Sequence, residues 1–414
     1  MPHALRARLS LIFLTQYFAA GSWIVSLGSY MSKTLGFDSI IATAYSMVGF
    51  ATIAATLFVG VIADRYLSAQ KVLSVLSFGS AATLFWLSTI TQSHALFLAV
   101  ILLHCMFYIS SIPLLATIAF NAIENPGQDY PSIRVFGSIG WVVAGLIVGM
   151  IPGAGQSKLP MIIGACTYLL QSGYALTLPR TPPRARGQKI NIPGLFGFDI
   201  LGRVRNASFW IFMACVLFVV IPKKFYDSFA NNFLVEKGMS FAAGNFVFEP
   251  TAIQTLGQMA EVPTLLLLPF LIARLGIKWV MVIGMAGWVV RFSLFAYGFD
   301  GNHAIVPMLL TGILLHGLSY DFFFVSGQIY LDRLFDPAMR ARVQAFYWFV
   351  LSGLGVVLGA LIAGGVYREF TFAQSDHDWM SIWLAPAGVT LVVAILFAWS
   401  FREPPASSAS AIVE

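Results

Sequence analysis

The stretch Ile382-Trp-Leu-Ala-Pro-Ala-Gly-Val-Thr-Leu-Val-Val-Ala-Ile-Leu-Phe-Ala-Trp-Ser-Phe401 contains no charged side chain. An α-helix rises about 1.5 Å per residue, so about 20 apolar residues cross the hydrocarbon core of a bilayer, which is about 30 Å thick. The stretch is therefore long enough to span a membrane as a helix, and similar stretches recur along the chain.

The composition of the whole chain supports the same interpretation. Of 414 residues, 58% are hydrophobic and 10% are charged, whereas a soluble domain has about 25% charged residues. A soluble fold could not bury so much apolar surface, and we expect an all-α membrane protein with twelve transmembrane helices. These are predicted at residues 7–30, 40–62, 72–90, 95–120, 133–151, 161–178, 209–231, 252–272, 277–297, 304–330, 343–366 and 382–401.

A polar stretch at residues 180–205 divides the predicted helices into two sets of six, and it contains six Lys or Arg residues. We expect an N-terminal six-helix bundle at 1–179, a cytoplasmic linker loop at 180–206 and a C-terminal, pseudo-symmetric six-helix bundle at 207–414. Loops on the cytoplasmic side of a membrane are rich in Lys and Arg. Most basic residues fall on the side of the linker loop and of both termini, which predicts cytoplasmic termini in a bacterial inner membrane.

The sequence contains few signs of catalytic or cofactor chemistry. The three cysteines lie in apolar stretches without the paired spacing of metal or redox sites, and no G-x-x-x-x-G-K-[ST] motif for ATP occurs. The basic residues form no continuous stripe for nucleic acid. We therefore expect a monomer in the lipid bilayer that is not an enzyme and has no cofactor, no metal site and no nucleic-acid partner.

The loop after the second predicted helix reads Gly60-Val-Ile-Ala-Asp64-Arg65-Tyr-Leu-Ser-Ala-Gln-Lys71, and residues 273–278 repeat it weakly in the second half. The pattern resembles the loop signature of the major facilitator superfamily. An acid near a helix end can hold a cation across the seam between two halves, so Asp64 and Arg65 are candidate gating residues. The alternative is a solvated turn whose charges only set the topology.

Polar residues inside the predicted helices suggest a binding site, because charge is costly in a membrane. Arg134, Ser138 and Trp141 are spaced i, i+4 and i+7 and therefore share one helix face. Three further helices each have a short polar face, and we expect the four faces to line one cavity. The further faces contain Lys224 and Asp227; Gln258 and Glu261; and His316, Tyr320 and Asp321.

Several longer stretches of the sequence resemble those of one known family. The chain resembles the nucleoside:proton symporter family of the major facilitator superfamily from the first predicted helix to the twelfth. The strings that carry the resemblance are Gly21-Ser-Trp23, Pro131-Ser-Ile-Arg134-Val-Phe-Gly-Ser138-Ile-Gly140-Trp141, Gln258-Met-Ala-Glu261, Arg291-Phe-Ser-Leu-Phe-Ala-Tyr-Gly298 and Ser319-Tyr-Asp321-Phe-Phe.

The resemblance implies proton-coupled uptake of nucleosides or closely related small polar solutes by alternating access. It implies that Arg134, Ser138 and Trp141 contact the nucleoside and that Gln258 and Glu261 contact ribose and base. It also implies that Asp321 is the protonatable group. A carboxyl group removed from water binds a proton more readily, so Glu261 is a second candidate for proton coupling.

This chain departs from the family pattern in two predicted helices. Lys224 and Asp227 replace neutral amides, and His316 replaces a tyrosine, so the ligand could differ. The lysine and aspartate either neutralise each other or bind a charged solute.

Several of these residues also have structural interpretations. Arg134 could pair with an acid, Trp141 and Tyr320 could be packing residues, and His316 could hydrogen-bond to a neighbour. We assign Arg291 to structure, as an arginine paired with an acid. The alternative functions are a proton-coupled sugar importer, a drug/proton antiporter of the same fold and a membrane sensor that does not transport.

Overall fold

The computed structural model describes residues 2–58, 67–182, 192–202, 204–372 and 377–403. The chain forms two compact units. Unit 1 comprises Met1–Ile190 and Ser240–Thr255, and unit 2 comprises Asn191–Met239 and Leu256–Glu414. The predicted bundle boundaries at 179 and 207 stay predictions.

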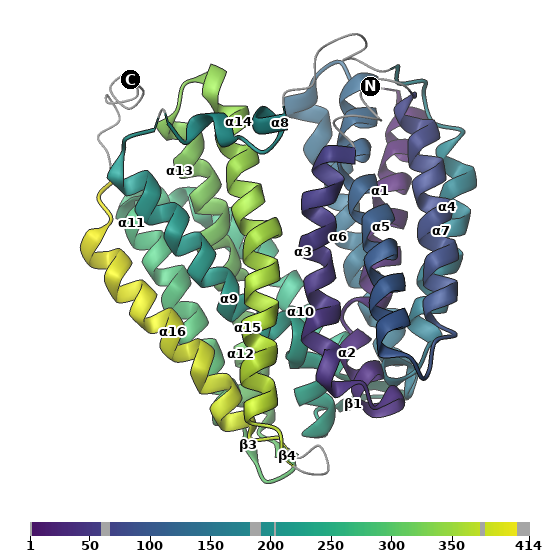
Figure 1. Ribbon diagram of the computed structural model, residues 1–414, viewed down its shortest axis with the longest axis vertical. Coiled ribbons are helices and arrows are strands. Elements are labelled where there is room, and N and C mark those ends of the chain that lie inside the picture. The colour runs from purple at the N-terminus through teal and green to yellow at the C-terminus, as the bar shows by residue number, and fades with distance from the viewer. Residues whose placement is uncertain (1, 59–66, 183–191, 203, 373–376, 404–414) are drawn as a thin grey trace. The chain divides into compact units, whose positions relative to one another are not determined.

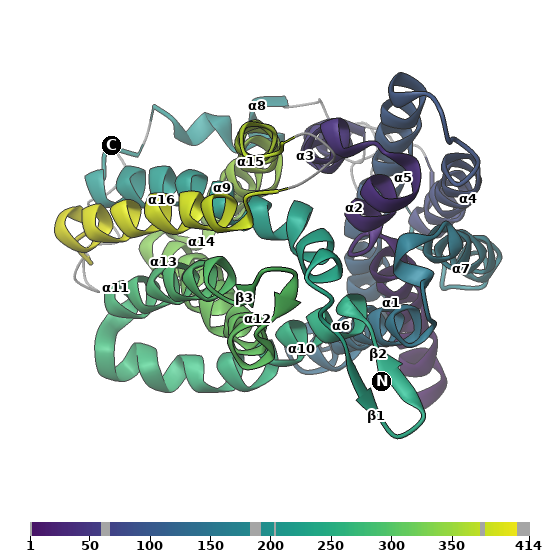
Figure 2. The ribbon, with the colours of Figure 1, turned by 90° about the horizontal axis from the view of Figure 1, so that it is seen from below.

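Unit 1 is a bundle of long helices in which α1 packs against α6 and α7, α4 against α5 and α7, and α3 against α5 (Figure 1). A short hairpin, β1–β2, lies beside α6 (Figure 2) and pairs Phe241 with Phe248. The helices and strands are α1 His3–Trp23, α2 Leu27–Tyr30, η1 Met31–Leu35, η2 Asp38–Ile40, α3 Ile41–Phe58, α4 Ala69–Leu87, α5 His94–Ala122, α6 Pro126–Met150, η4 Ala154–Gln156, α7 Leu159–Ala175, β1 Phe241–Ala243 and β2 Phe246–Phe248.

In unit 2, α9 packs against α15 and α16, and α11 packs against α12 and α16. The elements are α8 Ile192–Leu195, η5 Phe198–Ile200, α9 Ala207–Glu236, α11 Glu261–Ala296, β3 Phe299–Asp300, β4 His303–Ala304, α12 Val306–Tyr320, η6 Asp321–Val325, α13 Ser326–Leu334, α14 Pro337–Trp348, η7 Phe349–Leu354, α15 Gly355–Glu369 and α16 Trp379–Ser400. Helix α10, Pro250–Met259, contributes residues to both units.

Nine helices in the described part of the chain are long and apolar enough to cross a membrane. Helices α4 and α7 cover two more of the predicted spans. One of the nine, at Pro250–Ala296, covers two predicted spans. The two spans meet within α11 at Gly276, where φ is 79° and the helix bends. The all-α membrane fold is confirmed, and the count of twelve stays a prediction. The predicted gating residues Asp64 and Arg65 lie outside the described residues.

Large apolar side chains cover the outside of the helices. Trp399 is 83% exposed, Leu266 79% and Leu170 75%. In water such a surface would favour association or aggregation. In a bilayer it is in contact with lipid chains, which are as apolar as the side chains themselves.

Local sequence accounts for several helix starts. The side chains of Ser93, Asn206 and Asp378 each accept a hydrogen bond from a backbone N–H in the first turn of α5, α9 and α16. Such caps satisfy amide groups that have no partner within the helix.

Four predicted helices are interrupted, which the apolar pattern did not reveal. In the predicted helix 7–30, α1 ends at Trp23 and α2 begins at Leu27. The predicted helix 252–272 is divided between α10 and α11 by one turn residue, Ala260, whose backbone stays in the α region; we refer to this point as the break between α10 and α11. The predicted helices 304–330 and 343–366 each contain a π-helical turn, η6 and η7. π-Turns widen a helix by one residue per turn and often occur at functional sites. An apolar run stays apolar through such a turn, so hydrophobicity alone could not locate it.

Polar contacts also join the helices of unit 1. The fully buried Gln16 of α1 donates from Nε2 to Ser111 of α5 at 2.8 Å. Gln171 of α7 donates to Gln16 Oε1 at 2.5 Å and to Ser77 of α4 at 3.1 Å. Interhelical hydrogen bonds of this kind hold membrane helices together where the lipid supplies no hydrophobic driving force.

Close approach of α1 and α6 depends on Gly140. A Cβ atom at this position would lie 2.3 Å from the carbonyl oxygen of Leu14, a backbone atom that cannot move without shifting α1. We expect Gly140→Ala to lower the free energy of unfolding by about 1–3 kcal/mol, as overpacking does, measured by thermal unfolding in detergent. Gly173→Ala is the matched control, because a Cβ there meets no atom within 4 Å. Equal melting temperatures for the two variants would contradict this packing.

Candidate functional site

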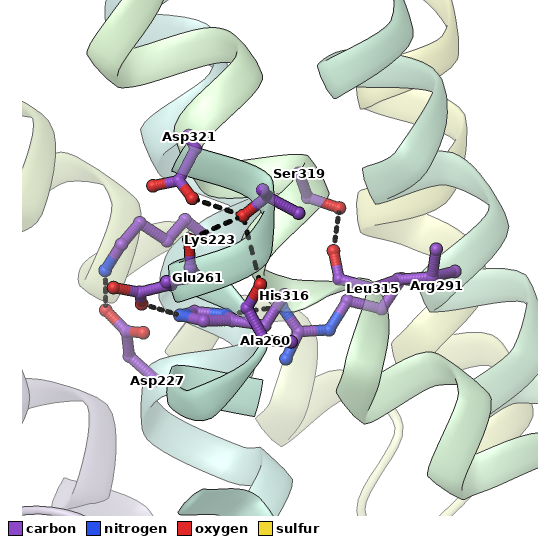
Figure 3. A network of polar contacts seen from close by, with 10 residues as sticks. Lys223, Asp227, Ala260, Glu261, Arg291, Leu315, His316, Ser319 and Asp321 are labelled. Atoms are coloured by element: carbon purple, nitrogen blue, oxygen red, sulfur yellow. Dashed lines mark hydrogen bonds and ion pairs between the residues drawn. The ribbon is translucent and has the colours of Figure 1, made fainter. Parts of the chain in front are cut away.

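Unit 2 contains a group of ionisable side chains that lie close together on α9, α11, α12 and η6, most of which are shown in Figure 3. We refer to it as the charged cluster. It contains three cations, three carboxylates and one histidine. Its members are Lys223, Lys224, Arg291, Asp227, Glu261, Asp321 and His316.

Helix α9 contributes two lysines that share one acid. Asp227 Oδ2 lies 2.5 Å from Lys223 Nζ and 3.2 Å from Lys224 Nζ. The spacings i, i+4 and i, i+3 bring all three side chains to one face of the helix. Lys224 is buried, whereas the Lys223 and Asp227 side chains are 21% and 24% exposed.

A second set of contacts links α11 to α12. Arg291 Nη1 lies 2.8 Å from His316 Nδ1, and His316 Nε2 lies 3.2 Å from Glu261 Oε1 (Figure 3). A guanidinium group can only donate hydrogen bonds, so Nδ1 must be the acceptor. The proton of a neutral His316 is therefore on Nε2, from which it is donated to Glu261.

Arg291 has no exposed surface. Its guanidinium carbon lies 3.6 Å from the centre of the Tyr226 ring, a cation–π contact. We expected a direct ion pair with an acid. In the described part of unit 2 the arginine instead reaches Glu261 through His316.

Asp321 stands at the first residue of the π-turn η6 and is 1% exposed. Its Oδ2 lies 2.5 Å from the hydroxyl oxygen of Thr264 on α11. Among the described residues, no cation lies within ion-pair distance of this carboxyl group. Asp321 thus differs from Asp227 and Glu261, each of which contacts a basic side chain.

The contacts across α11 and α12 require their backbones to lie unusually close. A Cβ atom on Gly317 of α12 would lie 2.4 Å from the carbonyl oxygen of Ala260 and 2.7 Å from the backbone nitrogen of Glu261. Any larger residue would separate α12 from the break between α10 and α11. The glycine therefore sets the distances from His316 to Glu261 and from Asp321 to Thr264.

Exposure distinguishes the inner from the outer members of the charged cluster. Arg291, His316 and Asp321 are buried, whereas 28% of the Glu261 side chain is exposed. Gln258, on α10 just before the break, and Tyr320, at the end of α12, are half-buried. Within the charged cluster, Glu261, Lys223 and Asp227 are thus the partly exposed members.

The predicted polar face of α6 lies in unit 1. Arg134 and Trp141 are half-buried and Ser138 is exposed. The guanidinium carbon of Arg134 lies 4.5 Å from the centre of the Tyr17 ring, and within the described part of unit 1 no carboxylate forms an ion pair with it. Trp141 packs its backbone and ring against Gly21 of α1. Trp141 therefore packs against α1, and as a residue it is still half-buried rather than fully buried.

The structure brings together Lys224, Asp227, Glu261, His316 and Asp321 in unit 2. Gln258 and Tyr320 lie beside them on α10 and α12. Arg134, Ser138 and Trp141 belong to unit 1, so a single cavity lined by all four predicted faces stays a prediction.

The site prediction omitted three residues with clear contacts: Lys223, Thr264 and Arg291. The spacing of Lys223, four residues before Asp227, could have identified it. Arg291 stands out as a charge inside an apolar helix, but we had assigned it to structure. For Thr264 the sequence holds no comparable signal, because its partner Asp321 lies on another helix.

The chain is similar to known proteins over nearly its whole length. Residues 3–406 match the family model described as nucleoside H+ symporter. YegT of Escherichia coli (strain K12) is 35% identical over 410 residues, which cover 96% of this chain and 94% of YegT. The xanthosine permease of the same organism is 31% identical over 402 residues and 95% of both chains. A crystal structure of a mutant of the nucleoside transporter NupG superposes with a TM-score of 0.87 at 29% identity, covering 96% of this chain and all of that one.

The shared acid of α9 generates a prediction about stability. Asp227→Asn leaves Lys223 and Lys224 without their carboxylate, so we expect the free energy of unfolding to fall by about 2 kcal/mol. This loss is smaller than the ~3–5 kcal/mol that follows when one partner of a fully buried ion pair is removed, because Asp227 is partly exposed. Lys223→Gln combined with Asp227→Asn should recover part of the loss. A double-mutant cycle measured by thermal unfolding tests this, and additive effects would contradict it.

Proposed function

This chain belongs to the nucleoside H+ symporter family, and we propose that it imports nucleosides together with protons across a bacterial inner membrane. It is a multi-pass membrane protein, and we propose that both of its termini are cytoplasmic. The excess of Lys and Arg in the predicted loops on that side supports this orientation. We also propose that the protein works as a monomer.

One observation carries the proton coupling: Asp321 is buried within the membrane-spanning part of unit 2 with a neutral hydroxyl as its partner. Charge within a membrane is costly without a partner, so acids in this position commonly carry protons. Asp227 is instead held by two lysines, and Glu261 accepts a hydrogen bond from His316, which Arg291 contacts in turn. Asp321 is therefore the primary proton-coupling residue. Glu261 is secondary.

The exposed part of the charged cluster suits a nucleoside. Ribose presents hydroxyl groups as donors, and a base presents both donors and acceptors. The free oxygen of Glu261 accepts hydrogen bonds, and the amide of Gln258 both donates and accepts. Tyr320, whose ring is stacked on His316, adds an aromatic side chain beside these two residues. We propose that these three residues bind the solute.

Lys223, Lys224 and Asp227 affect selectivity. Because Asp227 contacts both lysines, the three together carry one positive charge. We propose that they bind a polar or partly anionic edge of the solute. The replacement of neutral amides typical of the family by Lys224 and Asp227 supports a substrate preference that differs from that of other members.

In unit 1, we propose that Arg134, Ser138 and Trp141 contact the nucleoside. The guanidinium group is held over Tyr17 and keeps its donors free of a carboxylate in the described part of that unit. Arginine provides several donors in a fixed plane, which suits the carbonyl groups of a base. We also retain Asp64 and Arg65 as proposed gating residues.

The transport cycle follows from these roles. Asp321 takes up a proton from the outer side, which removes a buried charge, and the nucleoside binds. The protein then exposes both to the cytoplasm, where the lower proton concentration favours release. A sugar importer or a drug/proton antiporter would share this fold. The polar and charged character of the cluster favours a small polar solute over a drug.

We expect Asp321→Asn to uncouple transport from the proton gradient while nucleoside binding is largely kept. The amide resembles a protonated carboxyl group in shape but cannot release a proton. In proteoliposomes the variant should exchange labelled uridine or adenosine across the membrane without accumulating it. Wild-type uptake should rise when the outside is acidified.

Asp332→Asn is the matched control for that experiment, because Asp332 is 57% exposed and pairs with Arg340 outside the charged cluster. It should accumulate nucleoside as the wild type does. If Asp321→Asn still concentrates nucleoside under a proton gradient, Asp321 does not couple transport. A wild-type protein that binds nucleoside but does not move it would instead be a sensor.

We expect Arg134→Ala to weaken nucleoside binding by about 10-fold or more, the value of a hydrogen bond to a charged donor, with little change in folding. Thermal shift with added nucleoside measures binding, since the stabilisation by a ligand grows with the logarithm of its concentration divided by Kd. Arg274→Ala is the control, because Arg274 makes a similar cation–π contact, 4.7 Å from Phe270, outside the cluster. Loss of folding in Arg134→Ala with ligand protection retained would assign Arg134 to structure.

A further inference from the structure

The hydroxyl group of Thr264 lies within hydrogen-bond distance of three acceptors. Its Oγ1 is 2.5 Å from Asp321 Oδ2, 2.9 Å from the carbonyl oxygen of Glu261 and 3.1 Å from that of Ala260. A hydroxyl group has one proton to donate. Thr264 can therefore donate a hydrogen bond either to the carboxyl group on η6 or to a backbone carbonyl group near the start of its own helix.

The protonation state of Asp321 determines which of these acceptors receives the hydrogen bond from Thr264. When Asp321 is charged, both of its oxygens are acceptors, and Thr264 must donate to it. The 2.5 Å distance is within the range of about 2.5–2.7 Å for a hydroxyl that donates to a carboxylate. When Asp321 carries a proton, its own O–H can donate to Thr264 Oγ1. The proton of Thr264 then turns to the carbonyl oxygen of Glu261 or Ala260.

The two carbonyl groups belong to Ala260, which lies between α10 and α11, and to Glu261, the first residue of α11. Gln258 and Glu261, which we propose as nucleoside ligands, lie on either side of the break between α10 and α11. Close packing against Gly317 holds its backbone in place. A hydrogen bond gained or lost at these carbonyls therefore acts directly on the segment that positions both ligands.

We infer that Thr264 is a positioning residue that conveys the protonation of Asp321 to the Gln258–Glu261 segment by reversing the direction of one hydrogen bond. The inference rests on the proposed role of Asp321 and extends it to a residue on another helix. No atom other than the Thr264 proton and the proton bound by Asp321 has to move between partners.

Other ionisable groups surround Asp321 and are left unchanged in the test. They are Glu261 on α11, His316 on α12 and the Lys223–Asp227 pair on α9 (Figure 3). Because these groups are identical in wild type and in Thr264 variants, a difference in pH response between them reports on the hydroxyl.

The decisive comparison is Thr264→Val with Thr264→Ser. Valine has nearly the same shape without the hydroxyl, and serine keeps the hydroxyl. Loss of the donor makes charged Asp321 less stable, so less acid is needed to protonate it. We expect the midpoint of the pH profile of uridine uptake in proteoliposomes to move to higher pH by about one unit in Thr264→Val. Thr264→Ser should retain the wild-type midpoint.

Nucleoside binding gives a second readout. Wild-type affinity for uridine should differ severalfold between mildly acidic and mildly alkaline buffer, and in Thr264→Val this difference should shrink. The control is Thr390→Val, because Thr390 is also buried and bonds only to the backbone, with 2.7 Å to the carbonyl oxygen of Pro386. If Thr264→Val does not fold, Thr264→Ala removes the same hydroxyl with less bulk.

The outcomes separate this inference from the proposed function. If a folded Thr264→Val protein has the wild-type pH profile and affinity difference while Asp321→Asn is uncoupled, Thr264 has no coupling role. If Asp321→Asn still accumulates nucleoside, the coupling role of Asp321 itself is wrong. A Thr264→Ser protein that behaves like Thr264→Val would also overturn the inference, because the hydroxyl would then not be the active group.

Discussion

The cost of charge in a medium of low dielectric constrains the structure of unit 2. Its charged cluster contains three cations and three carboxylates, so charges can balance within the protein. Asp227 holds Lys223 and Lys224 to one face of α9. Arg291 fixes the orientation and the proton position of His316, which in turn bonds to Glu261. These contacts determine how α11 and α12 meet, because each partner alone would be an unpaired charge inside the membrane-spanning helices.

Because the charges of the cluster balance, the binding of one proton changes its net charge. Among the described residues, Asp321 is the carboxylate of the cluster that bonds to a hydroxyl group rather than to a lysine or a histidine, and its protonation leaves an excess positive charge on the remainder. Gly317 packs against Ala260 and Glu261, and Thr264 lies within hydrogen-bond distance of the carbonyl oxygens of the same two residues and of Asp321. The proposed proton carrier and the proposed solute ligands Gln258 and Glu261 are thus linked through one short segment of backbone.

Most members of the candidate site could be predicted from the sequence, because charged residues in apolar helices are rare and conspicuous. The residues with which they pair could not be predicted in this way. No pattern in the sequence favoured His316 over an acid as the partner of Arg291, and none pointed to Thr264. Both pairings depend on two helices that approach closely at Gly317, and a glycine in a helix sequence does not say which neighbour it faces.

The sequence by itself determined the all-α membrane fold, since runs of about 20 apolar residues have few other stable environments. It also determined the family, through strings spread over the whole chain, and the polar faces, through helical spacing. Only the tertiary structure decided where helices break or widen, at Ala260, η6 and η7. It also decided which polar groups meet. Those features depend on contacts between residues far apart in the chain, and apolar periodicity carries no information about them.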